Sequence, residues 1–207
     1  MMDLLNTGVS DMANTNTPFG FRQYSGTGSA PTYEQVAVPI VYNASAIYYG
    51  DPVINDANGY VTVGAAASTE VNATIAGIFQ GCKYLSVAQK RTVWSNYWPG
   101  SDVASPNLVE GYIVNDPNAK FIVQSDATGL TQAAVNANIG YNTGVGNTAT
   151  GISGAFLGAT IATTATYPFR VISLVTNPPG VNGTEAGAYN HVIVAFNSVA
   201  TKQLTGV

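Results

Sequence analysis

The stretch Gln35-Val36-Ala37-Val38-Pro39-Ile40-Val41-Tyr42 decides the fold class. From Val36 to Tyr42 every second residue is a large apolar one, a period of two that is typical of a β-strand with one buried face. Pro39 has no N–H group to donate to a neighbouring strand. We therefore expect this strand at the edge of a sheet or at a bulge.

Short β-rich runs separated by turn residues continue along the chain. Asn58-Gly59 predicts a hairpin turn before a strand at 60–63, and Gly77 and Gly81 predict bulges in a strand over 73–84. Further strands are expected at residues 91–97, 109–115, 120–124, 169–175 and 189–196. This spacing predicts an all-β barrel or sandwich with no internal repeat.

Two other segments carry weaker patterns. Thr131 is placed to cap one short helix over residues 131–138, an Ala-rich run followed by Gly140. Residues 142–166 are rich in Gly, Thr and Ala, and we expect a loop with one irregular strand there.

The N-terminal segment has a different pattern. Residues 1–33 have almost no apolar period, and we interpret them as an extended arm that precedes a β-rich domain at 34–207. Met12 and the residues after it look like an ordinary bacterial or viral start. Residues 1–11 are therefore expected to be an upstream start-site extension.

Charge and composition exclude several function classes. Only 9% of the 207 residues are charged and the net charge is −4, so the chain lacks the basic surface of a nucleic-acid binder. A hydrophobic content of 46% argues against disorder. One Cys and one His exclude an internal disulfide and an ordinary Cys/His metal site. We find no signal peptide and no apolar run long enough for a membrane helix.

The residues that could do chemistry are few and scattered. We expect His191 to be structural and Cys82 to be a buried, inert thiol. Asp51 and Asp116 each precede a proline and are expected to start turns. The Gly-rich stretches lack the Lys-Ser/Thr of a phosphate loop. We predict no catalytic residue, no cofactor and no metal.

The segment 83–98 is the most informative one. No acidic residue occurs between Glu70 and Asp102, and the gap holds three of the seven basic residues and both tryptophans. The candidate contact residues are Lys90, Arg91, Trp94, Tyr97 and Trp98. Aromatic residues and Arg are enriched at interface hot spots. A core strand with a solvated basic turn, a contact surface and a sugar-stacking platform all stay open.

The low charge itself points to an assembly. A free monomer with so few charges would tend to associate, whereas a surface covered by neighbouring subunits does not need them. We therefore expect a subunit of something larger.

The start of the chain resembles a known family. Ala13-Asn14-Thr15-Asn16-Thr17-Pro18-Phe19-Gly20-Phe21-Arg22 is similar to the opening of tailed-bacteriophage head structural proteins, which begin Met-Ala-Asn followed by Pro-x-Gly-Phe-Arg. Further agreement in order is found at residues 48–53, 75–81, 169–175 and 205–207. The aromatic cluster at 94–98 and the eleven residues before Met12 depart from the family pattern.

The resemblance implies a capsid decoration (cement) protein. Such a protein has a β-barrel or β-tulip domain, sits on the outer capsid surface of the virion, and bridges neighbouring major capsid proteins as a homodimer or homotrimer. It implies no enzymatic activity. On this interpretation the arm residues Phe19, Phe21, Arg22 and Tyr24 lie across capsid subunits. An acidic protein fits an outer location, because packaged DNA would repel it.

The main alternative is a tail or fibre module that binds host glycan. In that case Trp94, Tyr97 and Trp98 would form the stacking surface. A scaffold protein and an enzyme are weaker alternatives.

Overall fold

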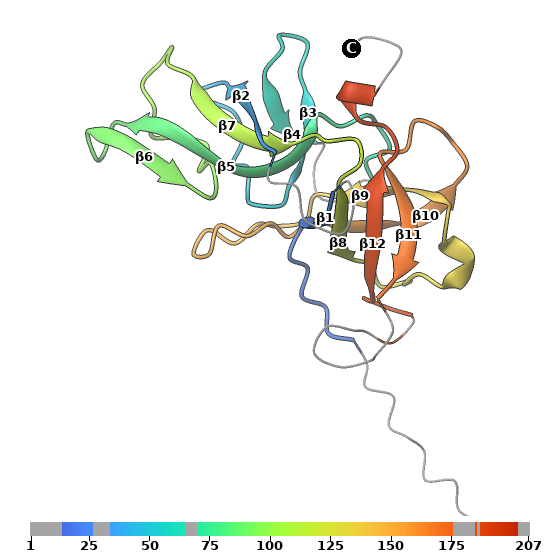
Figure 1. Ribbon diagram of the computed structural model, residues 1–207. Helices are drawn as coiled ribbons and strands as arrows, with labels where there is room; N and C mark the ends of the chain where they lie inside the picture. The colour runs from blue at the N-terminus through green and yellow to red at the C-terminus, as the bar shows by residue number, and fades with distance from the viewer. Residues whose placement is uncertain (1–13, 27–33, 65–69, 176–184, 186, 203–207) are drawn as a thin grey trace, which may run out of the picture.

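The computed structural model describes residues 14–26, 34–64, 70–175, 185 and 187–202 (Figure 1). Twelve strands form two six-stranded sheets, and the described helices are two 3-10 turns of three residues each. The prediction of an all-β, sandwich-like fold is confirmed. The chain folds this way because its β-rich runs are short and are separated by Gly, Pro, Asn and Asp.

Sheet A lies on the right in Figure 1 and is entirely antiparallel. In spatial order its strands are β1 (Arg22–Ser25), β8 (Lys120–Gln124), β12 (His191–Phe196), β11 (Phe169–Leu174), β9 (Asn138–Asn142) and β10 (Phe156–Ala162).

Sheet B lies on the left, and its β5–β6 hairpin projects away from sheet A (Figure 1). Its strands are β2 (Val36–Ile40), β7 (Val109–Val114), β5 (Gly77–Ser86), β3 (Pro52–Asn55) and β4 (Val61–Val63), with β6 (Arg91–Ser95) paired to β5. β2 and β4, at the two ends of this path, contact each other, so the sheet curls around its own core.

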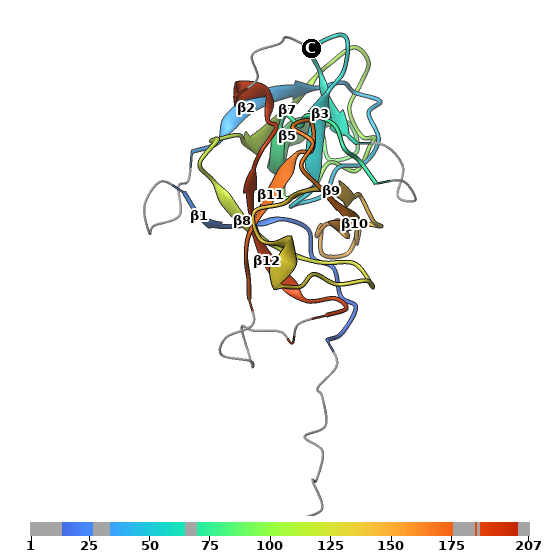
Figure 2. The same cartoon turned by 90° about the vertical axis from the view of Figure 1, so that its right-hand side faces the viewer.

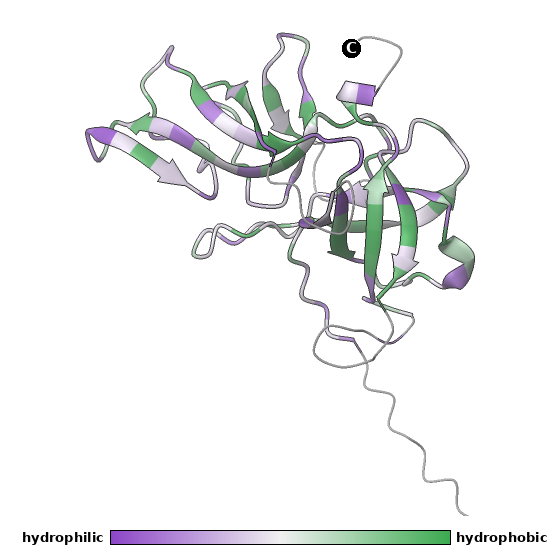
Figure 3. Ribbon diagram, in the orientation of Figure 1, coloured by the Kyte–Doolittle hydropathy of each residue, from purple (hydrophilic) through white to green (hydrophobic). Residues whose placement is uncertain are grey.

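Two apolar clusters fill the molecule. The larger one lies against sheet A and includes Phe21, Phe121 and Phe169, together with Ile78 and Val114 from the near ends of sheet B. The smaller one is enclosed by sheet B. Figure 3 shows hydrophobic strands in sheet A and a hydrophilic turn at the tip of the β5–β6 hairpin. The cores therefore meet where the two sheets join.

Most strand predictions are confirmed, with one correction. β2 is an edge strand, as Pro39 indicated, and residues 58–59 do lie in the turn of the β3–β4 hairpin. The β5 register shifts between Phe79 and Gly81, whereas Gly77 pairs regularly with Val53. The bulge predicted at Gly77 is wrong. Gly77 lets β5 and β7 approach each other closely here, because a Cβ would lie 2.5 Å from the Val114 carbonyl oxygen.

Of the two weakly patterned segments, the first differs from expectation. The helix predicted at 131–138 is a single 3-10 turn, Gln132–Ala134, because Val135 returns to extended backbone and Thr131 makes no side-chain cap. A second turn, Ala200–Lys202, was not predicted. Residues 142–166 contain the whole of β10, whose pairing with β9 shifts register between Leu157 and Ile161. The expectation of a loop with one irregular strand there is confirmed.

The N-terminal segment is part of the domain. Residues 22–25 form β1, which lies beside β8 at the edge of sheet A (Figure 2). Gln124 on β8 holds the preceding residues, because its Oε1 accepts from Thr17 N–H at 3.1 Å and its Nε2 donates to the Thr15 carbonyl at 2.9 Å. The predicted boundary between an arm at 1–33 and a β-rich domain at 34–207 is wrong, because β1 is a strand of sheet A and the residues before it are held by Gln124. Residues 1–13 and 27–33, including the proposed extension 1–11, lie outside the described residues.

Candidate functional site

The candidate site lies on the outer face of sheet B, across β6, β5 and β7. Along β5, Cys82, Tyr84 and Ser86 point inward and are buried. Lys83 and Leu85 point to the other face, where Leu85 is largely exposed. This alternation follows from the period of two of a β-strand.

A row of three side chains crosses the sheet at Lys83. Lys83 pairs in register with Trp94 on β6 and with Glu110 on β7. Its Nζ lies 2.9 Å from Oε2 of Glu110 and 5.1 Å from the centre of the Trp94 ring. The Lys83 ammonium group therefore forms an ion pair with Glu110 on one side and a cation–π contact with Trp94 on the other.

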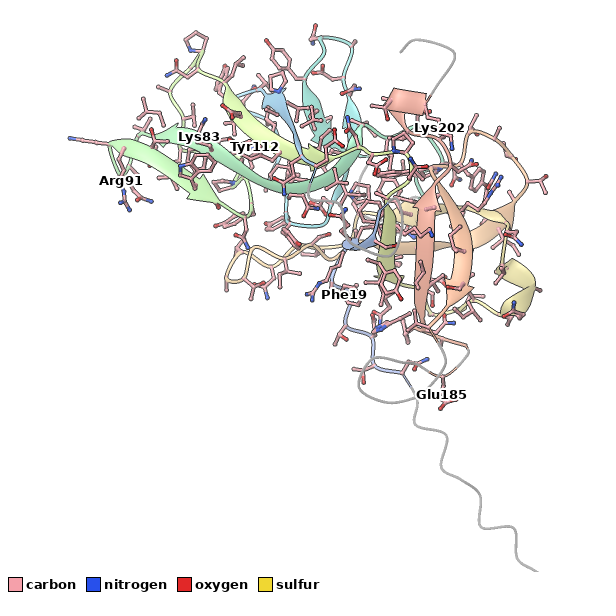
Figure 4. The ribbon with its side chains drawn as sticks, viewed as in Figure 1. Phe19, Lys83, Arg91, Tyr112, Glu185 and Lys202 are labelled. Atoms are coloured by element: carbon pink, nitrogen blue, oxygen red, sulfur yellow. The ribbon has the colours of Figure 1, made fainter. Side chains whose placement is uncertain are left out.

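Tyr112 completes the cluster from β7. Its ring stacks on Trp94 with centroids 5.8 Å apart and planes 6° apart. Its hydroxyl donates to Oε1 of Glu110 at 2.6 Å. We call Lys83, Trp94, Glu110 and Tyr112 the aromatic ladder. Figure 4 shows Lys83 and Tyr112 together on the β5–β7 part of the sheet.

Gly81 makes this stack geometrically feasible. It pairs with Tyr112 and has no side chain to stand between β7 and β6. Its φ of 147° belongs to a region that favours glycine, and a Cβ would lie 2.8 Å from the Ser95 carbonyl oxygen. The tyrosine ring can therefore reach diagonally across β5 to the indole.

The ladder borders a hollow of about 480 Å³. Its lining includes Trp94 and Tyr112 together with the amide side chains of Gln35, Gln80 and Asn96. Gln80 Nε2 is buried and has no hydrogen-bond partner within the described part of the chain. A buried donor without a partner costs free energy and is satisfied when an acceptor reaches it.

The electrostatics of the ladder are self-contained. Hydrogen bonds from the Tyr112 hydroxyl and from Lys83 lower the pKa of Glu110, and Glu110 in turn raises the pKa of Lys83. Both groups are charged at neutral pH and they neutralise each other. The site therefore presents aromatic faces and amides rather than a net charge.

The contact residues predicted at 90–98 differ in exposure. Trp94 is 68% exposed, and Lys90 and Arg91 lie at the exposed tip of the hairpin. Trp98 is fully buried, and its Nε1 donates to the Ala44 carbonyl at 3.2 Å. The prediction that Trp98 belongs to a contact or stacking surface is wrong, because the chain bends after β6 and turns its indole into the core of sheet B.

Tyr97 takes an intermediate position. Its ring is half-buried and stacks on Tyr48 with centroids 5.5 Å apart. Tyr97 therefore fixes the loop after β6 to the segment before β3, and its ring is not part of the aromatic ladder.

The predicted arm residues separate in the same way. Phe21 is fully buried and stacks on Phe169 with centroids 4.4 Å apart, so its prediction as a capsid contact is wrong. Phe19 packs edge-on against His191 at 5.2 Å and lies under the Arg22 guanidinium at 4.9 Å. Tyr24 is 54% exposed on β1. Figure 4 places Phe19 well away from Arg91 on the hairpin.

The groups that could do chemistry have structural environments. Cys82 is buried, which raises the pKa of its thiol to about 12. Burial lowers the pKa of His191, whose ring contacts Phe19. Asp51 accepts from Tyr48 N–H at 2.7 Å and from the Ser153 hydroxyl, as expected of a turn residue that also joins two segments. Burial raises the pKa of Asp51 to about 6.

None of the helices in the described residues combines the length and the hydropathy needed to cross a bilayer. This described part of the chain also contains no group of three or more His, Cys, Asp or Glu side chains arranged to hold a metal ion.

Sequence reasoning missed the partners of Trp94. Tyr112 and Glu110 flank Gly111 on a predicted strand, but only the strand register shows that they face Lys83 and Trp94. Gln80 carries no sequence signal of its own, because its role depends on the bulge in which it lies, between Phe79 and Gly81.

Comparisons with protein-family models, with curated proteins and with solved structures found no match to this chain.

Proposed function

We propose that this chain is a non-enzymatic capsid decoration (cement) protein of a tailed bacteriophage, which binds the outer surface of the head and bridges major capsid proteins. The resemblance of residues 13–22 to the opening of phage head proteins supports this proposal. The low charged fraction and the all-β fold are compatible with it.

The exposure of Trp94 is the observation that carries the proposal. A tryptophan exposed by 68% is unusual on a free surface, and this one is held in place by Tyr112 and Lys83. Leu85, also on the outer face, is 55% exposed. A rigid, exposed aromatic residue with apolar neighbours has the character of an interface hot spot. We propose that this face contacts the capsid.

The mechanism is mechanical. Each contact alone is modest, but linked copies on one shell bind multivalently and stabilise it against internal pressure. Self-association as a dimer or trimer would supply that linkage. With a net charge of −4, the protein suits the outside of the head better than the DNA-filled interior.

The test uses heads of the encoding phage made without this protein. Purified wild-type chain should cosediment with these heads at a fixed, high stoichiometry. Trp94→Ala should weaken this binding by about 30-fold, the scale of a hot-spot residue. The matched control is Ile161→Ala, which removes an exposed apolar side chain from β10 in sheet A. Equal binding by the wild type and Trp94→Ala would contradict the proposed contact face.

A truncation tests the arm separately. Removing residues 1–13 leaves Phe21 and β1 in the chain, so it tests a role of the extreme N-terminus without opening the core. Unchanged head binding by this variant would contradict a capsid contact made by residues 1–13, since Phe19, Arg22 and Tyr24 stay in the chain.

The Gln80 amide favours glycan binding as a second candidate function. Sugars offer C–H faces to indole rings and hydroxyls to amides, and the hollow beside Trp94 provides both kinds of group. The neutralised Lys83–Glu110 pair suits a neutral sugar. Titration with neutral monosaccharides, followed by tryptophan fluorescence, tests it, because Trp94 is the exposed one of the two tryptophans. The glycan function would replace the capsid proposal if the wild-type chain responds to a sugar, Gln80→Leu does not, and the wild-type chain does not bind heads.

A further inference from the structure

The outer face of sheet A carries a second hollow, of about 470 Å³. Three of the chain's seven Lys and Arg residues line it: Lys120, Arg170 and Lys202. Asn118 and Asn197 add amides to the lining, and no acidic side chain from the described residues belongs to it. Such a concentration of positive charge stands out in a chain with a net charge of −4.

The strand register explains why the hollow exists. Lys120 on β8 pairs with Ala195 on β12, and Ala195 pairs with Arg170 on β11. The two cations are therefore two strand spacings apart, about 9–10 Å between backbones. Because the residue between them is an alanine, a space is left where both cations can reach the same group. Lys202 closes one side from the turn Ala200–Lys202.

The charges in this hollow are not neutralised by the described chain. Its one ion pair joins Lys83 to Glu110, on sheet B. Arg170 Nε donates to the Asn138 side-chain oxygen at 3.2 Å, a neutral partner that orients the guanidinium. Asp116, near the rim, accepts from the backbone N–H of Asn118 at 2.9 Å. Figure 4 shows Lys202 well away from Lys83 and Arg91.

We propose that this basic hollow binds an acidic segment of a partner protein, whose carboxylates lie between Lys120 and Arg170. Arg and Lys form charge-assisted hydrogen bonds with carboxylates, and Arg can do so with two parallel bonds. An extended segment places alternate side chains about 7 Å apart, so neighbouring carboxylates can reach different cations of the hollow.

A short acidic segment fits better than a nucleic acid. Three cations match two or three carboxylates, whereas a nucleic acid presents a long row of phosphates to a protein that is acidic overall. The inference concerns sheet A alone and does not depend on capsid binding by sheet B.

The experiment uses the full chain and a fluorescein-labelled oligoglutamate peptide, with oligoglutamine as the uncharged control. We expect oligoglutamate alone to raise the fluorescence anisotropy at low salt. The double variant Lys120→Gln/Arg170→Gln should weaken binding by about tenfold or more. Lys90→Gln/Arg91→Gln removes the same charge from the hairpin tip and should bind like the wild type, because those residues lie outside the hollow.

Three results would overturn the proposal. They are no binding of oligoglutamate, equal weakening by the two double variants, and tighter binding of single-stranded oligothymidine than of the peptide. The last result would assign the hollow to nucleic acid. If the double variant fails to fold, Lys202→Gln is the substitute, because it lies outside the strands and should weaken binding about threefold, as expected of one exposed charge pair. Head binding is measured separately, so its failure leaves this result interpretable.

Discussion

The two sheets use the same cross-strand geometry to make opposite surfaces. In sheet B the row runs Trp94, Lys83, Glu110, with a long cation in the middle that is neutralised by its neighbour. In sheet A the row runs Lys120, Ala195, Arg170, with a methyl group in the middle and a cation on each side. The size of the central residue therefore decides whether a row becomes a filled platform or a charged hollow.

We expect the two faces to belong to one cooperative domain. Phe21 lies in the larger core and donates its backbone N–H to the Gly50 carbonyl at 2.9 Å, in the segment that leads into β3. Phe21→Ala should lower the free energy of unfolding by about 3–5 kcal/mol, through lost apolar contact and a cavity. Urea unfolding followed by tryptophan fluorescence, which reports on sheet B, measures it.

Phe19→Ala is the control for this prediction. Phe19 is only half-buried, so its substitution should lower the free energy of unfolding clearly less than Phe21→Ala does. If Phe21→Ala leaves the sheet B transition where it is, the two sheets unfold independently and the single-domain comparison fails.

Asp51 provides a pH test of the contact between the two regions. It lies just before β3 of sheet B, and it accepts from Ser153, which precedes β10 of sheet A. Burial raises its pKa from the ordinary 3.8 to about 6. Between these values the folded chain holds a proton that the unfolded chain releases, so stability should fall as the pH rises through this window.

The size of this effect is set by the shift in pKa. At about 1.4 kcal/mol per pH unit, Asp51 should account for a loss of up to about 3 kcal/mol by pH 7. Asp51→Asn should flatten the dependence, because the amide can keep hydrogen bonds to Tyr48 N–H and Ser153 without ionising. Thermal unfolding midpoints of both proteins across this window give the answer. A slope that is the same in both would assign the pH dependence to other groups.

The stack in sheet B should contribute a measurable coupling energy. A double-mutant cycle with Trp94→Ala and Tyr112→Ala should give about 0.5–1.5 kcal/mol, the range for stacked aromatic pairs. Chemical denaturation of the wild type, the two single variants and the double variant measures this coupling energy. The diagonal pair Trp94 and Leu85, which does not stack, is the reference cycle. A Trp94–Tyr112 coupling no larger than this reference would show that the platform is not rigid.

The smallest expected change in stability comes from filling the hollow of sheet A. Ala195→Glu places a carboxylate between Lys120 and Arg170 and should change stability by about 0–1 kcal/mol, the scale of an exposed ion pair. It should also abolish binding of oligoglutamate. Ala195→Gln has the same length without the charge and should retain part of the binding. Undiminished binding by Ala195→Glu would exclude the space between the cations as the site.

The sequence predicted the features that depend on local pattern. The period of two located most strands, and Pro39 correctly indicated an edge strand. β9 is harder to predict, because it begins at Asn138, where the Ala-rich run 131–138 indicates a short helix instead. β10 fits the one irregular strand expected within 142–166. The arm was assigned from its polar composition, yet one buried aromatic residue, Phe21, anchors it in the core.

The candidate sites needed information that a single sequence does not contain. Trp94 and Trp98 are four positions apart, and the backbone bend between them sends one outward and the other inward. Lys120, Arg170 and Lys202 are distant in sequence and meet only through the order of β8, β12 and β11. Strand order and register are tertiary properties, so the basic hollow was not foreseen.

The most direct test of the account is a crossed binding measurement on two variants. Trp94→Ala and Lys120→Gln/Arg170→Gln are each assayed for cosedimentation with undecorated heads and for oligoglutamate binding. We expect Trp94→Ala to lose binding to heads and to keep binding to the peptide. We expect the double variant to lose binding to the peptide. Loss of both activities in both variants would contradict the claim that the two sheets carry separate binding surfaces.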